Sequence, residues 1–257
     1  MPDASTTSPV SPKTKYRKDY EAPAYIVETV DLDVTIQEEH TRVRGRMEIR
    51  ENSASSASGG ELELDGEDLV LVRVAVDGVE IDASRYTVGP ESLTVTGLPS
   101  ACVLETEVII EPQLNTRFEG LYKSGPMFLT QCEAEGFRRI TYFLDRPDTM
   151  ARYTTTIHAD AERYPVLLSN GNLVDSGTEE DGRHWARWED PFPKPSYLFA
   201  LVAGDLHNHQ SSFTTMSGRE VELRVYVENH HADKCEHAMN SLIHAMRWDE
   251  ENFAREY

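Results

Sequence analysis

The central segment of the chain reads TQCEAEGFRRITYFLDRPD from Thr130 to Asp148. Polar side chains, a glycine and an aromatic run lie unusually close together in it, and strand-like sequence flanks it on both sides. Glu133 and Glu135 are separated by one alanine, so in an extended segment both carboxylates would point to the same side and could meet a cation. From spacing alone, a solvated rim on a loop is the commoner arrangement, because charged residues are mostly exposed.

Length and charge restrict the class of protein. A chain of 257 residues can form one large domain or two modest ones with a real core. Its 39% hydrophobic and 27% charged residues are ordinary for a soluble globular protein. The formal net charge of -20 makes the surface potential strongly negative. We therefore expect neither nucleic acid nor a membrane as partner, since binding to either needs a basic patch, whereas cationic ligands would be attracted.

Cysteine usage and the first residues indicate the compartment. Cys102, Cys132 and Cys235 are odd in number and widely spaced, which favours a reducing compartment without a disulfide framework. Residues 1–15 are rich in Ser, Thr and Pro and predict a disordered lead-in rather than a signal peptide. No window approaches the roughly 18 consecutive apolar residues of a membrane span. We expect a soluble, cytoplasmic protein.

Apolar and polar residues alternate over Tyr25–Ile36 and again over Val43–Arg50, which predicts two half-buried strands paired as a hairpin. Asp77-Gly78 predicts a further tight turn. Many short strands with frequent turns indicate a mainly β protein. The other expected strands are Leu62–Leu64, Leu69–Val76, Tyr86–Val88, Ser92–Thr96, Cys102–Ile110, Arg152–Ala159, Val166–Ser169 and His184–Trp188.

The pattern changes towards the end of the chain. The almost unbroken apolar run Tyr197–Ala203 predicts a strand buried on both faces. A polar, histidine-bearing segment, Asp205–Ser212, is followed by a hairpin around Ser217-Gly218. From Ala232 onward the apolar period becomes about 3.6 residues, which predicts the one long helix. Its stripe consists of Cys235, Met239, Leu242, Met246 and Phe253.

No complete active site follows from residue spacing. His230, His231, Cys235 and His237 are zinc-ligand types close in sequence, but the His-Glu-x-x-His pattern that supplies two ligands and a catalytic carboxylate is absent. We interpret these four as solvent-facing residues at a helix start. The chain also lacks a Gly-x-Ser-x-Gly elbow and a glycine-rich phosphate loop.

Several blocks, in order, match one known family. They are Lys15–Pro23, Leu121–Gly125, Gln131–Asp148, Leu168–Asn172, Asp190–Pro195, Leu198–Asp205 and Arg247–Phe253. On these blocks the chain resembles the beginning of the bacterial aminopeptidase N family, alanyl aminopeptidases of the zinc-dependent gluzincin superfamily. The segment Ile140–Pro147 departs from the broader family and resembles its bacterial subgroup.

The resemblance implies a mainly β fold and two site residues. Residues 16–204 would form a saddle-shaped β-rich N-terminal domain, and residues 205–257 would begin a thermolysin-like α+β catalytic domain with a β-hairpin and a helix. Glu133 would bind the α-ammonium of the substrate, and Gln131 would line the pocket for its first side chain. A carboxylate offers an ammonium a charge-assisted hydrogen bond, which an internal amide cannot use. Glu135 would be structural.

The resemblance also implies a zinc-dependent aminopeptidase that removes residues from peptides with a free amino terminus. The Gly-Ala-Met-Glu-Asn segment, the His-Glu-x-x-His helix and the remaining zinc ligand would lie beyond Tyr257. We therefore expect no catalytic residue and no metal ligand in this chain, and no activity from it alone, because metal-activated hydrolysis needs three ligands and an open position. The alternative is a non-catalytic β-rich scaffold or binding module that keeps the fold. The sequence that follows Tyr257 in the gene would separate the two.

Overall fold

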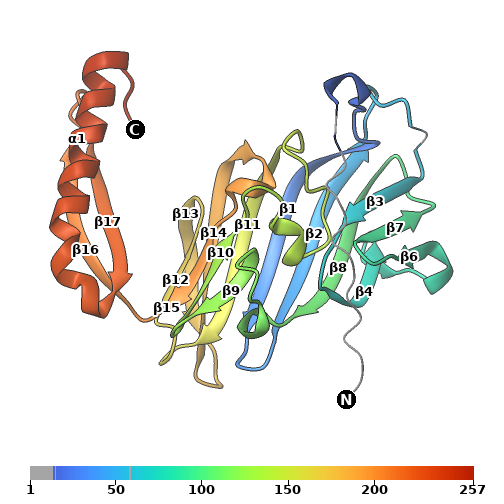
Figure 1. Ribbon diagram of the computed structural model, residues 1–257, viewed down its shortest axis with the longest axis horizontal. Helices are drawn as coiled ribbons and strands as arrows, with labels where there is room; N and C mark the ends of the chain where they lie inside the picture. Colours follow the sequence, from blue (N-terminus) through green and yellow to red (C-terminus); the bar gives the residue numbers. More distant parts are fainter. Residues whose placement is uncertain (1–13, 15, 58) are drawn as a thin grey trace.

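The computed structural model describes residues 14, 16–57 and 59–257 (Figure 1). The predicted lead-in over residues 1–15 therefore lies outside the described residues, apart from Thr14. Four sheets and one long helix make up the described chain. The predicted mainly β fold class, with a hairpin and a helix at its C-terminal end, is confirmed.

The largest sheet has eight strands in the order β13-β14-β11-β1-β2-β8-β4-β5. The pair β1–β11 is parallel, and the remaining neighbours are antiparallel. The strands are β1 (Tyr25–Ile36), β2 (Thr41–Glu51), β4 (Val70–Val76), β5 (Val79–Glu80), β8 (Ala101–Ile110), β11 (Ala151–Asp160), β13 (Asn172–Thr178) and β14 (Arg183–Lys194). The β1–β2 hairpin and the Asp77-Gly78 turn have the predicted places.

Two smaller sheets pack with the large one. One has the order β3-β7-β6, and the other has the order β12-β15-β10-β9. Their strands are β3 (Glu61–Asp65), β6 (Tyr86–Val88), β7 (Ser92–Thr96), β9 (Gly120–Ser124), β10 (Met127–Gln131), β12 (Val166–Ser169) and β15 (Leu201–Gly204). One short 3-10 turn, Arg17–Asp19, precedes β1, and others connect strands at Ala83–Arg85, Pro112–Leu114, Phe137–Arg139 and Ser196–Leu198.

The central segment contributes aromatic side chains to the core between the sheets. Phe137 and Phe143 are fully buried, and their ring centroids are 5.0 Å apart in an edge-to-face arrangement. Phe137 also contacts Tyr153 of β11 and Phe199 near β15, with centroid distances of 6.0 Å and 5.2 Å. Such aromatic contacts each contribute about 0.5–1.5 kcal/mol beyond the burial of area. The segment therefore joins the large sheet to the four-stranded one.

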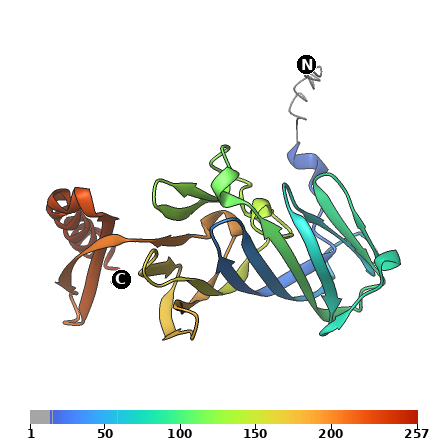
Figure 2. The ribbon, with the colours of Figure 1, turned by 90° about the horizontal axis from the view of Figure 1, so that it is seen from below.

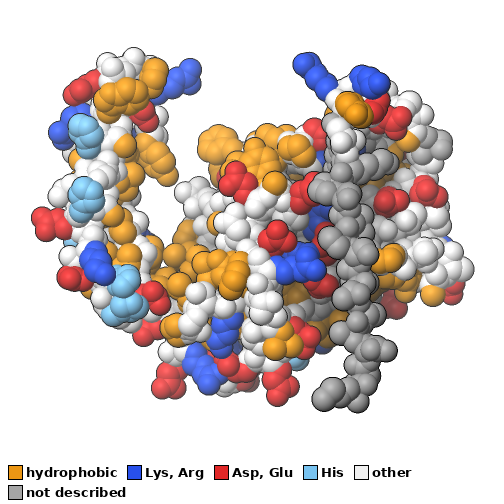
Figure 3. Space-filling model, in the orientation of Figure 1, with side chains coloured by type: hydrophobic (Ala, Val, Ile, Leu, Met, Phe, Trp, Pro, Cys, Tyr) orange, Lys and Arg blue, Asp and Glu red, His pale blue; other side chains and the backbone are white. Residues whose placement is uncertain are grey.

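The C-terminal residues form a unit of their own. It consists of the hairpin β16 (Leu206–Thr214) and β17 (Glu220–Glu228), the 3-10 helix η6 (Asn229–Lys234) and the helix α1 (Cys235–Phe253). Figures 1 and 2 place this unit at one end of the molecule, and Figure 3 shows an open hollow between it and the β-rich body. Its separate apolar core comprises Phe213, Val221, Leu223 and Met239. Among the described residues, no helix is long and apolar enough to cross a membrane.

The structure differs from the predictions in several places, and strands β9 and β10 are not among the predicted ones. The predicted strand Tyr197–Ala203 is wrong in its first half, because Leu198 N–H and Phe199 N–H bond to the carbonyls of Pro195 and Ser196 in a 3-10 turn, and β15 begins only at Leu201. The polar segment Asp205–Ser212 is mostly strand β16, since it pairs with β17. Strand β13 was not predicted, because most of its side chains are exposed. The domain boundary after residue 204 stays a prediction.

His158 on β11 connects three parts of the large sheet. Its Nδ1 lies 2.7 Å from Glu179 Oε1 and its Nε2 lies 3.4 Å from Asp33 Oδ2 of β1. Arg183 Nε lies 3.3 Å from the other Glu179 oxygen, and Arg44 is a further cation that acts on Asp33. Asp33 foremost, and then Glu179, raise the pKa of His158 against the opposing effect of burial. In turn, His158 lowers the pKa of Asp33.

This arrangement predicts a pH-dependent stability. A raised pKa means that the stabilisation by His158 is fully present below its ordinary pKa of about 6.5 and disappears as the pH rises through the folded-state value. We expect His158→Gln to lower the free energy of unfolding by about 1 kcal/mol at pH 5.5 and by much less at pH 9. Urea unfolding followed by tryptophan fluorescence measures this, with exposed His237→Gln as control. An equal loss at both pH values would contradict the role of His158 as a cation.

Candidate functional site

The turn after β10 presents the two predicted site residues. Gln131 ends β10, and the chain then reverses over residues 132–136 before the 3-10 turn Phe137–Arg139. Cys132 is buried, and burial raises the pKa of its thiol, so it anchors the turn rather than acting as a nucleophile. A Cβ on Gly136 would lie 2.5 Å from the Gln131 carbonyl oxygen, so only glycine fits there. The peptide bond between Glu133 and Ala134 is cis.

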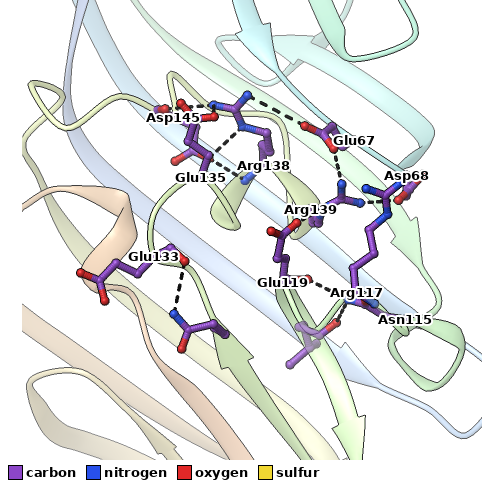
Figure 4. A network of polar contacts seen from close by, with 12 residues as sticks. Glu67, Asp68, Asn115, Arg117, Glu119, Glu133, Glu135, Arg138, Arg139 and Asp145 are labelled. Atoms are coloured by element: carbon purple, nitrogen blue, oxygen red, sulfur yellow. Dashed lines mark hydrogen bonds and ion pairs between the residues drawn. The ribbon is translucent and has the colours of Figure 1, made fainter. Parts of the chain in front are cut away.

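Glu133 and Gln131 lie together on the surface. Both are exposed, and Gln131 Nε2 donates a hydrogen bond of 3.3 Å to the Glu133 carbonyl oxygen (Figure 4). Among the residues that the structure describes, no basic side chain pairs with the Glu133 carboxylate. This carboxylate is thus available to a cation from outside the described chain.

Glu133 and Glu135 do not share a side, because the segment is not extended; both are exposed on a turn, which agrees with the solvated loop that spacing favours. The physical reason is the turn, which replaces the alternation of a strand. Figure 4 shows Glu133 pointing away from the network of polar contacts that includes Glu135. Glu135 Oε2 lies 3.7 Å from the guanidinium of Arg138. A structural role for Glu135 was predicted, and this contact is consistent with it.

Arg138 and Asp145 hold the base of the turn. Arg138 Nε lies 3.1 Å from Asp145 Oδ2, and the same oxygen accepts a bond from the Arg138 backbone N–H. Asp145 is buried, and its other oxygen accepts a bond of 2.6 Å from Ser196 Oγ. Burial by itself would lower the pKa of Arg138, but Asp65, Asp145 and Glu135 together raise it. A largely buried pair with this many hydrogen bonds fixes the geometry of the turn.

Arg139 fixes the other side of the same turn. It is buried and pairs with Glu67 and Asp68, which precede β4. Its Nε lies 3.3 Å from Glu119, directly before β9 (Figure 4). The two consecutive arginines therefore attach the turn to separate parts of the fold. Sequence reasoning did not assign them a role, although paired Arg residues next to an acidic run are a visible signal.

The four residues weighed as zinc ligands do not meet at one point. The interpretation of all four as solvent-facing is wrong for Cys235, which is buried and whose thiol donates to the His231 carbonyl oxygen at 3.8 Å. His231 is partly buried, and His230 and His237 are exposed. Instead, the ligand atoms of His230, His231 and Glu228 approach one another. Glu228 was missed because it lies at the end of a strand, outside the histidine-rich segment.

Comparison with known proteins agrees with the fold and the motifs. The sequence profile of the Peptidase M1 N-terminal domain matches residues 17–198. The chain belongs to this family. It is 49% identical over 247 residues to Aminopeptidase N of Caulobacter vibrioides and 49% identical over 246 residues to Aminopeptidase N of Escherichia coli. In each case the match covers 96% of this chain but only 28% of the relative.

Solved structures show the same fold for this M1 N-terminal portion. Legionella pneumophila aminopeptidase A in complex with aspartic acid superposes with a TM-score of 0.91 and 36% identity, over 95% of this chain and 29% of that one. An M1 zinc metallopeptidase from Deinococcus radiodurans, a E323A mutant bound to a Tyr-Ser-Ala substrate, gives a TM-score of 0.67 and 17% identity over 80% of this chain and 48% of that one, which shows the fold alone. The predicted resemblance is confirmed.

The network under the turn gives a stability prediction for the M1 N-terminal domain. Asp145→Ala should lower the free energy of unfolding by about 3 kcal/mol, because it removes a buried partner of Arg138 and leaves Ser196 Oγ unpaired. The control Glu135→Gln should change it by less than about 0.5 kcal/mol, since that side chain is 55% exposed. Urea denaturation of both variants provides the measurement. A loss below 1 kcal/mol for Asp145→Ala would show that the pair does not stabilise the turn.

Proposed function

We propose that this chain is the N-terminal portion of a zinc-dependent aminopeptidase that removes amino-terminal residues from peptides. Family membership and 49% identity to two bacterial Aminopeptidases N support the proposal. The observation that carries the site is the Glu133 carboxylate, which lies exposed beside Gln131 on a turn held by a buried ionic network. We also propose a cytoplasmic location, supported by three buried, unpaired cysteines.

Glu133 would bind the α-ammonium of the substrate. An exopeptidase must distinguish a chain end from an internal peptide bond, and only the end carries an ammonium that can donate a charge-assisted hydrogen bond to a carboxylate. Gln131 lies next to Glu133 and would contact the first side chain of the substrate. The net charge of -20 would attract cationic peptide ends towards the protein.

The residues around Glu133 do not fit a zinc ion. They offer one carboxylate and one carboxamide, whereas catalytic zinc takes three ligands from His, Cys or carboxylate side chains. We therefore assign Glu133 to the substrate and place the catalytic zinc, which would activate water, on the longer polypeptide. The chain spans a little over a quarter of the length of its two Aminopeptidase N relatives, 28% in both. On this proposal, the 257 residues alone do not hydrolyse peptides.

The experiment uses the enzyme of full family length. Glu133→Gln keeps the shape of the side chain but removes its charge, so kcat/KM for aminoacyl p-nitroanilides should fall by about 30- to 100-fold, which corresponds to about 2–3 kcal/mol of lost transition-state binding. Glu135→Gln removes the same charge two residues away and should change kcat/KM by less than about 2-fold. The wild type should reject N-acetylated substrates, and Glu133→Gln should lose part of this discrimination.

Two results would count against different parts of the proposal. If the wild-type enzyme does not release amino-terminal residues from unblocked peptides, the proposed activity is wrong. If it does so and Glu133→Gln has an unchanged kcat/KM, the activity stands and the assignment of Glu133 is wrong.

A further inference from the structure

Three potential metal ligands converge where the hairpin passes into α1. Glu228 is the last residue of β17, and His230 and His231 lie in η6. One ligand atom from each residue lies within 4.8 Å of the other two. His230 Nε2 is 3.9 Å from Glu228 Oε2, and the centroids of the two imidazole rings are also 3.9 Å apart. Figure 3 shows several histidine side chains at separate places along this unit.

His231 adds an independent observation. Its Nδ1 is buried and has no hydrogen-bond partner in the described part of the chain. Leaving a buried polar atom unpaired costs about 1–3 kcal/mol, so such atoms are rare and point to a ligand or an ordered water. A ligand that binds Nδ1 of His231 would therefore remove the free-energy cost of leaving this nitrogen unpaired.

We propose that Glu228, His230 and His231 bind one divalent metal ion such as Zn²⁺. Two imidazoles and one carboxylate favour Zn²⁺ or Ni²⁺ over Mg²⁺ and Ca²⁺, which prefer all-oxygen sites. Zinc–nitrogen bonds of about 2.0–2.1 Å require neighbouring tetrahedral ligand atoms to be about 3.3 Å apart. Ligand atoms that lie up to 4.8 Å apart therefore have to approach by up to about 1.5 Å, which rotation of the exposed His230 side chain and the partly exposed Glu228 side chain can supply.

The fold gives such an ion a structural effect. It would connect the end of β17 to η6, directly before α1. The apolar core of this unit comprises four buried side chains, Phe213, Val221, Leu223 and Met239. Small units with little buried apolar surface are commonly stabilised by a metal or a disulfide. Binding to the native state alone would raise the stability of the hairpin and the helix. This inference does not depend on the proposed activity.

The test uses the untagged 257-residue chain after removal of metal by a chelator. Zn²⁺ titrated into the wild type and followed by calorimetry should bind with one equivalent, and Co²⁺ should give visible absorption bands of a low-coordinate site. His231→Ala and Glu228→Gln should each weaken the binding of Zn²⁺ at least about 10-fold. His237→Ala, which removes an exposed histidine outside the cluster, should bind as the wild type does.

A second readout is independent of affinity. Zn²⁺ should raise the midpoint of thermal unfolding of the wild type and of His237→Ala, but not of His231→Ala. Circular dichroism of the metal-free variants shows that each one folds. The proposal is overturned if the wild type binds no Zn²⁺ below millimolar concentration, or if folded His231→Ala and Glu228→Gln bind it as tightly as the wild type.

Discussion

The largely buried ion pair between Arg138 and Asp145 is the interaction on which the rest of this structure depends. Asp145 accepts bonds from the backbone and side chain of Arg138 and from Ser196, the first residue of the 3-10 turn that precedes strand β15 of the four-stranded sheet. One carboxylate thus joins the turn after β10 to the approach to β15. Removing water from such an ion pair costs free energy. The pair contributes mainly to specificity, because only one geometry of the turn satisfies all its hydrogen bonds.

The apolar and ionic parts of the central segment act together. Phe137 and Phe143 enter the aromatic core, while the arginines between them turn towards carboxylates on separate elements. Because Phe137 and Arg138 are adjacent in the same 3-10 turn, the packing of the ring and the position of the guanidinium constrain each other. A turn held by both kinds of contact is rigid, so it can hold an exposed carboxylate in a fixed position.

The sequence predicts the parts of the fold whose pattern is local. Apolar and polar residues alternate along strands β1 and β2, because one face of each strand is buried. Asp77-Gly78 forms a tight turn, in which both residues have positive φ, 52° and 79°. Strand β13 could not be predicted, since an exposed edge strand carries no apolar alternation. Its pairing with β14 decides its structure. The same limit applies to the strand β16.

For the site, the sequence predicts identities but not directions. Gln131 and Glu133 could be named through resemblance, whereas the divergence of Glu133 from Glu135 depends on the turn closed by Gly136. The approach of Glu228 to the two histidines depends on where β17 ends and η6 begins. In each case, a change of backbone direction over a few residues decides which side chains meet. Such changes are set by tertiary contacts, so periodicity does not encode them.

The exposure of Glu133 has a consequence for the proposed function. A solvent-exposed ion pair contributes about 0–1 kcal/mol, too little to select a chain end over an internal peptide bond. The same pair contributes several kcal/mol once water is excluded from it. In the proposed enzyme, recognition therefore requires a second surface that covers the carboxylate when the peptide is bound. The turn supplies a fixed position for the charge, and the strength of the interaction comes from the surface that closes over it.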